Sequence, residues 1–175
     1  MLPRLLEQPK YKVLRKENNL EIRFYDTILT SSVKVSGNQY NALRKGFRPL
    51  VRYIGAKERV SEKISMTAPV IQTTNDETEN WTVSFAMPSK YNIDNLPKPT
   101  NDDIYFEEIQ PSLAAVIRFS GVADTSLLTR KASVLKRWLE LNGYTESSSP
   151  KFLFYNDPTT PGFLRRNDVM LIIDK

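Results

Sequence analysis

The stretch that decides the fold is residues 20–37, LEIRFYDTILTSSVKVSG, because it recurs without a gap as residues 104–121, IYFEEIQPSLAAVIRFSG. The pair Ser36-Gly37 at the end of the first copy returns as Ser120-Gly121 at the end of the second. Self-similarity of this kind indicates a duplicated structural unit. Each copy is interpreted as two consecutive strands.

A helical pattern follows each Ser-Gly pair, with apolar residues at steps of three and four. The apolar positions of the first helix are Leu43, Phe47, Leu50, Val51 and Ile54. Those of the second helix are Leu128, Ala132, Leu135 and Leu139. Asp124 or Thr125 is placed to cap the start of the second helix. Gly55 and Gly143 stand where glycine favours the end of a helix.

Gly46 and Pro49 interrupt the pattern of the first helix. A proline inside a helix costs about 3 kcal/mol, because it lacks a backbone donor and clashes with the preceding turn. Either the helix starts late and places Pro49 in its first turn, or it is kinked there. The pair indicates a bend needed to fit the sheet, or a surface that a ligand approaches closely.

Two further strands are predicted after each helix. Residues 63–70, KISMTAPV, alternate between apolar and polar, and Ala68-Pro69 ends the ladder because proline has no backbone donor. This segment aligns with residues 151–158, KFLFYNDP, and residues 81–87, WTVSFAM, align with residues 167–173, NDVMLII.

Each copy therefore contains two strands, one helix and two strands. Residues 73–80 are interpreted as a polar hairpin loop, and residues 89–103 as the connector between halves at about 11–88 and 104–174. Neither half alone could bury both its sheet and its helix. The sequence predicts one α+β domain over residues 1–175: a distorted antiparallel β-barrel flanked by two α-helices, formed by pseudo-two-fold duplication of a ββαββ unit.

Composition excludes several kinds of catalytic site. The chain has no cysteine and no histidine, which removes zinc sites built on those residues and nucleophiles activated by imidazole. The carboxylate clusters are Asp102-Asp103 and Glu107-Glu108. Neighbours on a strand point to opposite faces, so neither cluster makes an acid–base pair. We expect a protein without catalytic or metal-binding residues.

The charge of the chain bears on its partners. The net charge of +5 favours acidic partners, although a solvated basic surface is the alternative explanation. No basic block is dense enough for a nucleic-acid-binding tail, so no nucleic-acid partner is expected. No apolar run is long enough to span a bilayer, and the start lacks a signal-peptide core. The expected location is the cytoplasm.

Five motifs carry a resemblance to a known family. They are residues 44–55 (RKGFRPLVRYIG), 63–70 (KISMTAPV), 85–88 (FAMP), 119–121 (FSG) and 165–169 (RRNDV). With these motifs in family order, the chain resembles the SOUL/heme-binding protein family over about residues 11–174. The resemblance implies a distorted β-barrel with two helices related by a pseudo-two-fold. It also implies a carrier or buffer of heme and related tetrapyrroles, rather than an enzyme.

The resemblance also implies a site. In members of the vertebrate type the tetrapyrrole lies against the first helix, where apolar side chains contact the ring and basic side chains meet the propionates. The matching residues here are Arg44, Phe47, Val51 and Arg52. Another basic residue of those members falls where this chain has residues 160–162, TPG, so that contact is not carried over. Periodicity alone leaves core packing open for the two apolar residues, and a solvated face for the two arginines.

The absence of histidine affects the iron of any bound heme. A histidine has been proposed as the axial ligand in some members of the family, and this chain has none. A non-covalently bound heme would have a Tyr, Met or Lys ligand, or no axial ligand. Without a ligand, metal-free porphyrin should bind comparably. Met66 and Met87 are candidate pocket residues or weak ligands, and strand core is their alternative role.

Other functional classes remain open at this point. The basic face of the first helix could dock onto a protein or an anionic membrane, in a salt-dependent way. A hydrolase on a related duplicated scaffold would need a buried carboxylate facing a closed cavity. Residues 165–168, RRND, are interpreted as a structural hydrogen-bond network rather than a ligand site.

Overall fold

The computed structural model describes residues 5–56, 61–75 and 79–174. Within these ranges the strands are β1 (Tyr11–Glu17), β2 (Leu20–Tyr25), β3 (Ile28–Ser36), β4 (Val70–Thr74), β5 (Asn80–Ala86), β6 (Tyr105–Ile109), β7 (Ser112–Phe119), β8 (Thr145–Glu146), β9 (Lys151–Phe154) and β10 (Asn167–Asp174). The helices are α1 (Gln39–Ile54), α2 (Thr125–Leu141) and the short 3-10 helix η1 (Gly162–Leu164). In the described part of the chain, no helix is both long enough and apolar enough to cross a membrane.

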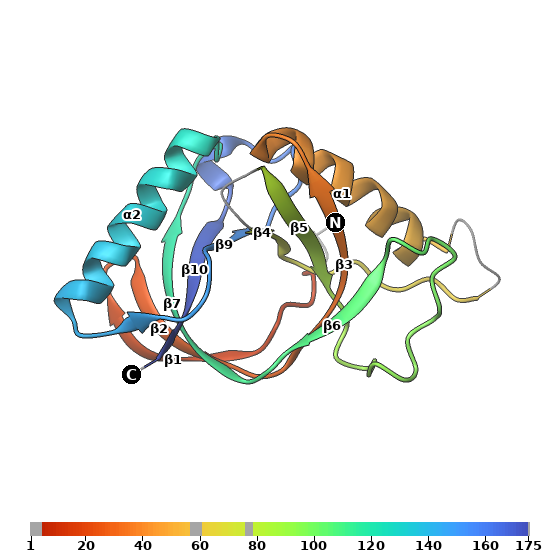
Figure 1. Ribbon diagram of the computed structural model, residues 1–175, viewed down its shortest axis with the longest axis horizontal. Coiled ribbons are helices and arrows are strands. Elements are labelled where there is room, and N and C mark those ends of the chain that lie inside the picture. The colour runs from red at the N-terminus through yellow and green to blue at the C-terminus, as the bar shows by residue number, and fades with distance from the viewer. Residues whose placement is uncertain (1–4, 57–60, 76–78, 175) are drawn as a thin grey trace.

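The strands form one curled antiparallel sheet in the order β1-β2-β7-β10-β9-β4-β5-β3-β6, with β8 paired to β10. Leu20 lies opposite Ile117, and Ile28 lies opposite Ile109, so β2–β7 and β3–β6 continue one register. Because β2 runs on into β3 and β6 runs on into β7, these two pairs form one bent ribbon that joins the two sides of the curled sheet (Figure 1). The predicted α+β distorted barrel with two helices is confirmed.

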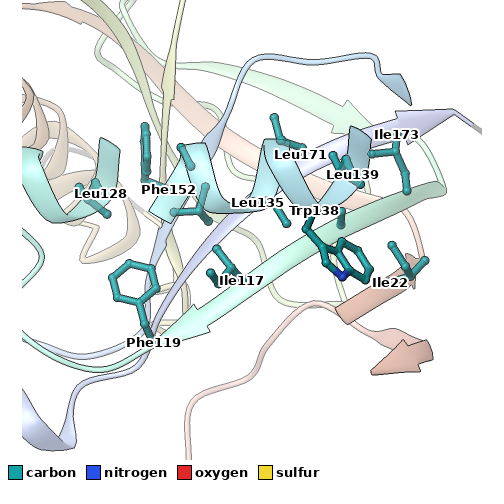
Figure 2. Close-up of a cluster of buried hydrophobic side chains, with 13 residues drawn as sticks. Ile22, Ile117, Phe119, Leu128, Leu135, Trp138, Leu139, Phe152, Leu171 and Ile173 are labelled. Atoms are coloured by element: carbon teal, nitrogen blue, oxygen red, sulfur yellow. The ribbon is translucent and has the colours of Figure 1, made fainter. Parts of the chain in front are cut away.

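The helices lie on the outside of the curled sheet (Figure 1). Alternate residues of β10 show the two faces: Val169 and Leu171 belong to the apolar cluster under α2, whereas Met170 belongs to the cluster inside the barrel. Figure 2 shows the outer cluster, in which Leu135 and Trp138 of α2 lie over the strands. Each helix thus buries one face against the sheet and leaves the other exposed.

The pairing of strands shows the duplication directly. Val33 of β3 lies opposite Val83 of β5, and Ile117 of β7 lies opposite Val169 of β10. The sequence alignment of the two halves matches Val33 with Ile117 and Val83 with Val169. The same register therefore occurs in both halves, as the pseudo-two-fold unit predicts.

The prediction for residues 63–70 was wrong. Strand β4 begins at Val70, where the predicted strand ends, and within residues 63–69 only Thr67 forms a bridge, to Glu7. The peptide between Ala68 and Pro69 is cis. The alternation that suggested a strand comes instead from the packing of Ile64, which is buried in the cluster under α1.

The alignment of residues 63–70 with residues 151–158 was wrong for the same reason. Ile71 of β4 lies opposite Ser84, and Lys151 of β9 lies opposite Met170. Since Ser84 and Met170 are equivalent in the duplication, Ile71 and Lys151 are equivalent too. The alternation of short apolar runs therefore gave the wrong register for this one strand.

The ends of both helices agree with the sequence. Asp124 caps α2, where its side chain accepts a hydrogen bond from the Leu127 backbone N–H at 2.8 Å.

Helix α1 contains Pro49 in its interior, so a late start is excluded. A Cβ atom on Gly46 would lie 2.5 Å from Val83 Cβ. Glycine at this position therefore allows α1 to lie close on β5.

Candidate ligand-binding site

The candidate site is built on α1, which is fixed at both its buried face and its first turn. Ala42, Gly46 and Leu50 are buried against the sheet. At the start of the helix, the indole N–H of Trp81 donates to the Gly37 carbonyl oxygen at 2.9 Å. Apolar packing along the helix and this anchor hold α1 in one orientation, so its outer side chains project from a rigid element.

One line of side chains runs along the exposed side of α1. Tyr40, Arg44, Phe47 and Val51, here called the α1 stripe, are spaced by four, three and four residues and therefore share one side of the helix. Tyr40 is 66% exposed and Phe47 is 36% exposed. The Phe47 ring contacts the edge of Phe85 at a centroid distance of 5.4 Å. The stripe is a partly exposed apolar surface, as contact with a flat ligand requires.

The charge on α1 has one sign only. The helix carries Arg44, Lys45, Arg48 and Arg52, and it contains no acidic residue. The Arg44 guanidinium lies 5.7 Å from the centre of the Tyr40 ring. An anionic group on this helix would therefore meet guanidinium groups, which bind carboxylates through charge-assisted hydrogen bonds.

The structure brings three of the four predicted site residues together and separates the fourth. Arg44, Phe47 and Val51 lie on the α1 stripe. Arg52 follows Arg44 by eight residues, which rotates it by about 80° around a helix of 3.6 residues per turn. It lines a cleft of about 200 Å³ on the other flank of the helix, together with Arg48.

The two methionines occupy different environments. Met87 is only 8% exposed and belongs to the apolar cluster under α1, so its alternative role as core is the observed one. Met66 is 38% exposed and lies in the segment between α1 and β4. Of the two sulfurs, the one of Met66 is therefore the more open to a ligand.

The barrel interior holds a buried ion network that the sequence did not reveal. Arg23 is 0% exposed. Its guanidinium donates to Glu21 at 2.6 Å, to the Tyr25 hydroxyl at 2.8 Å and to Asp168 at 2.9 Å. Arg166 also donates to Asp168, at 3.0 Å. Two carboxylates and two guanidiniums thus neutralise one another inside the barrel.

The pKa values of the network reflect this burial. Burial raises the pKa of Tyr25 to about 12, against the opposing effect of Arg23. Burial by itself lowers the pKa of the Arg23 guanidinium, but Tyr25 and Asp168 outweigh it and the pKa lies above its ordinary value. Tyr155, which packs under the Arg166 guanidinium, also has a raised pKa because of burial. All these shifts favour a neutral tyrosine beside a charged arginine.

The network explains the RRND motif. Arg166 and Asp168 belong to the ion network, and the Asn167 side chain donates to the Gly121 carbonyl oxygen at 3.0 Å. The motif is therefore a structural hydrogen-bond network, as the sequence indicated. Asp168 is the kind of buried carboxylate that a hydrolase would need, but it is paired with two arginines.

The signal for Arg23 was present in the sequence but ambiguous. It stands between Ile22 and Phe24 in a strand, and the alternation of β2 sends it to the face opposite Ile22. Its partner Asp168 is far away in sequence, so no local pattern connects them. Tyr40 also went unnoticed, although its spacing from Arg44 places it on the same side of α1.

Comparisons with known proteins agree with this architecture. The SOUL heme-binding protein family matches residues 6–172. Heme-binding protein 1 of Xenopus laevis is 29% identical over 158 residues, which cover 87% of this chain and 82% of that protein. The match therefore extends over nearly the whole fold.

Two solved structures share the fold at lower identity. The C-terminal domain of EcmrR has a TM-score of 0.72 and 14% identity, covering 94% of this chain and 98% of that one. A hydrolase from Listeria innocua has a TM-score of 0.61 and 11% identity, covering 92% and 94% of the two chains. At these identities the likeness establishes the fold alone.

Proposed function

Because this chain belongs to the SOUL heme-binding protein family, we propose that it binds heme or another tetrapyrrole non-covalently on the outer face of α1. The observation that carries the proposal is the α1 stripe, a partly exposed apolar surface on a helix whose charges are all positive. A tetrapyrrole has the same combination: a flat apolar ring with carboxylates at its edge. The name of the Xenopus relative gives further support.

Each predicted site residue has a separate role in this proposal. Phe47 and Val51 contact the ring, and Tyr40 extends the apolar contact by one turn. Arg44, on the same stripe, meets one propionate. Arg52 lies on the other flank, so it meets a propionate only if that group reaches over the helix. Because of this difference, we expect Arg44 to contribute more to affinity than Arg52.

The proposed role is that of a carrier or buffer without catalysis. A ligand on the outer face of a helix stays open to solvent on one side, which favours exchange over the sequestration that chemistry needs. With no histidine in the chain, the exposed Tyr40 hydroxyl is a possible iron ligand on the outer face of α1 itself. A weak ligand of this kind predicts that heme and metal-free porphyrin bind comparably.

The experiment is a titration of the protein with hemin and, separately, with protoporphyrin IX. Ligand binding is followed by the Soret band and by quenching of Trp81 and Trp138 fluorescence. We expect saturable binding of both ligands at micromolar protein, with affinities within about tenfold, which corresponds to 1.4 kcal/mol. Absence of saturable binding of either ligand would contradict the proposal.

A charge-reversed pair of variants tests the site itself. Arg44→Glu combined with Arg52→Glu should weaken hemin binding by at least tenfold, while the melting temperature stays nearly unchanged because both side chains are exposed. The matched control is Arg130→Glu combined with Arg137→Glu, which makes the same charge change on the exposed side of α2. Equal weakening by both pairs would indicate attraction by net charge, without a site on α1.

A second candidate function follows from the same helix. Since α1 carries four cations and no acid, its outer face could dock onto an anionic membrane or an acidic protein. Sedimentation with anionic vesicles at low and high salt distinguishes the two functions. Salt-sensitive vesicle binding in a protein that gives no tetrapyrrole spectrum would favour docking.

A further inference from the structure

The inner face of the barrel carries a second group of titratable side chains, apart from α1 and from the ion network. Lys151 of β9 lies opposite Thr73 of β4 and opposite Met170 of β10. Cross-strand partners share one face of a sheet, and Met170 belongs to the apolar cluster inside the barrel. The Lys151 side chain therefore points into the barrel, although lysine is among the residues least often buried.

A tyrosine and a carboxylate reach the same space from β6. Glu107 lies opposite Thr30, and Thr30 lies opposite Ala86 of the inner apolar cluster, so Glu107 also points inward. Tyr105, two residues earlier on β6, shares this face and forms a side-chain hydrogen bond with Thr82. Strands β9 and β6 are separated in the sheet by β4, β5 and β3, and the curl of the sheet turns their inner faces toward each other (Figure 1).

Lys151 differs from a surface lysine in its partners and in its exposure. No hydrogen bond or ion pair joins its amine to any residue in the described part of the chain. Burial lowers the pKa of Lys151, and Glu107 opposes this effect through its charge, without pairing to the amine. The side chain is half-buried, so it remains partly open to solvent. A desolvated amine of this kind is a better nucleophile at neutral pH than an exposed one, because more of it is uncharged.

The charges around Lys151 restrict the class of ligand. An anion would bind there against the repulsion of the Glu107 carboxylate. An uncharged carbonyl compound meets no such repulsion. The iminium that it forms with a lysine keeps the single positive charge of the ammonium, so the balance of charge with Glu107 is preserved.

We propose that Lys151 binds small aldehydes or ketones covalently and reversibly, as imines, on the inner face of the barrel. The uncharged amine attacks the carbonyl carbon, a nitrogen–carbon bond forms, and the carbonyl π electrons pass to the oxygen. A proton moves from the nitrogen to that oxygen, and the carbinolamine loses one water as the nitrogen lone pair forms the C=N bond. Nothing is oxidised or reduced. The proposal is independent of tetrapyrrole binding, because its evidence lies inside the barrel and not on the α1 stripe.

The test traps the imine on the intact protein with acetaldehyde and cyanoborohydride. The reductant converts the imine to a stable N-ethyl group, and peptide mass spectrometry gives the rate of labelling at each lysine. At pH 7 we expect Lys151 to be labelled at least fivefold faster than Lys12, an exposed lysine of β1. Labelling of Lys151 at an equal or lower rate would overturn the proposal.

A matched pair of variants tests the geometry of the cluster. Glu107→Gln removes the charge that opposes the effect of burial, so the pH of half-maximal labelling at Lys151 should fall further. Glu108→Gln removes the same charge from the other face of β6, where Glu108 lies opposite Leu29 of the cluster under α1, and should leave this pH unchanged. Equal shifts for the two variants would show that only net charge acts on the amine, and the assigned cluster would be wrong.

The other groups that face this space are the same in both variants. Strand β3 contributes Lys34, whose ammonium lies 6.0 Å from the centre of the Tyr105 ring. Strands β4 and β5 face the amine with threonines, which do not titrate. On β10 the nearest charge is Asp168, two residues from Met170, and the ion network neutralises it. A difference between the two variants therefore reports on Glu107 itself.

Discussion

Helices α1 and α2 are equivalent in the duplication, yet only their buried faces are alike. Aligned on their N-cap residues Asn38 and Asp124, the helices place Gly46 and Ala132 at the same position. Both residues are small and buried. Each helix lies on an equivalent pair of strands, so the same position must admit a close approach of helix to sheet.

The exposed faces differ in both apolar surface and charge. Phe47 of the α1 stripe corresponds to Ser133 of α2. The cations of α2 are partly paired: Arg137 lies 3.1 Å from Glu140 and Lys136 lies 3.4 Å from Glu146. Helix α1 contains no acidic residue. Burial against the sheet constrains one face of a helix, whereas the outer face is free to diverge and is where a function can arise.

The interior of the barrel shows the same loss of symmetry. Asp168 of β10 corresponds to Thr82 of β5, and Arg23 of β2 corresponds to Glu107 of β6. Asp168 is fully buried in the ion network, whereas Thr82 donates to the exposed Asn75 side chain at 2.9 Å. Only one half of the barrel contains the buried ion network, so equivalent positions contribute very differently to stability.

The largest expected effect comes from Asp168→Asn. The substitution removes the negative charge that Arg23 and Arg166 share, and it leaves a fully buried guanidinium undercompensated. Loss of one partner of a buried ion pair costs about 3–5 kcal/mol. The free energy of unfolding, measured by urea denaturation at pH 7, should fall by that amount.

The equivalent substitution in the other half serves as the control. Thr82→Val removes the exposed hydrogen bond to Asn75 and the one with the Tyr105 hydroxyl, and should change the free energy of unfolding by about 1–2 kcal/mol, less than Asp168→Asn. Similar losses for the two variants would mean that the halves are energetically symmetric after all, against the structure.

The next effect concerns the close approach of α1. Gly46→Ala places a Cβ atom 2.5 Å from Val83 Cβ, so the helix or the strand must shift. Overpacking costs about 1–3 kcal/mol, although alanine gains up to about 1 kcal/mol over glycine in a helix. We expect a net loss of about 1–2 kcal/mol in urea denaturation.

Two further variants make this prediction specific. Val83→Ala removes the two Cγ atoms from the contact but keeps the Cβ atom at 2.5 Å, so Gly46→Ala should cost less in that background without becoming neutral. On α2, Ala132→Gly tests the equivalent position in the reverse direction and should cost about 1 kcal/mol from helix propensity. Additive effects of Gly46→Ala and Val83→Ala would show that no contact couples them.

The smallest expected effect is a loss of stability at alkaline pH. It arises from Tyr25, in only one of the two halves of the barrel. Burial raises the pKa of Tyr25 to about 12, above the value of 10 in the unfolded chain. The stability from this group is fully present below pH 10 and is lost between pH 10 and pH 12, because the unfolded state ionises first. One pKa unit corresponds to about 1.4 kcal/mol, which is the loss expected at pH 11.

The measurement compares the protein with Tyr25→Phe at pH 8 and at pH 11. The wild type should lose about 1.4 kcal/mol more than the variant over this interval. Lys151, whose pKa is lowered by burial, is present in both proteins and cancels in the difference. Tyr155 cancels only in part, because Tyr25 contributes to its raised pKa. Ile109, the counterpart of Tyr25, has no ionisable group. Parallel pH profiles would contradict the assignment.

Several features of the fold were predictable because they depend on local pattern. The alternation and the repeated Ser-Gly pairs predicted the duplication, and Leu128, Leu135 and Leu139 predicted the buried face of α2. The strand at residues 63–70 failed because a short alternating run arises equally well from irregular chain with one buried side chain, here Ile64. The expected single domain and cytoplasmic location remain predictions.

The candidate site was predictable only in part. Arg44, Phe47 and Val51 came from the family resemblance, and their common side of α1 follows from helical spacing. Exposure did not follow, since periodicity alone favoured core packing for both apolar residues. The structure leaves Phe47 partly exposed and packs the half-buried Val51 against the apolar cluster under α1. The rotation of Arg52 away from the α1 stripe follows from the same spacing, but the cleft that Arg52 lines required the position of the connector.

The sequence by itself determined the duplicated ββαββ order, the capping residues and the absence of imidazole and thiol chemistry, because these depend on residue type and on spacing along the chain. The tertiary structure decided what lies across the molecule. It placed Arg23 against Asp168, brought Gly46 onto Val83 and formed the cleft between Arg52 and Asn101. Such contacts join residues far apart in sequence, and only the closure of the sheet and the packing of the helix upon it select them.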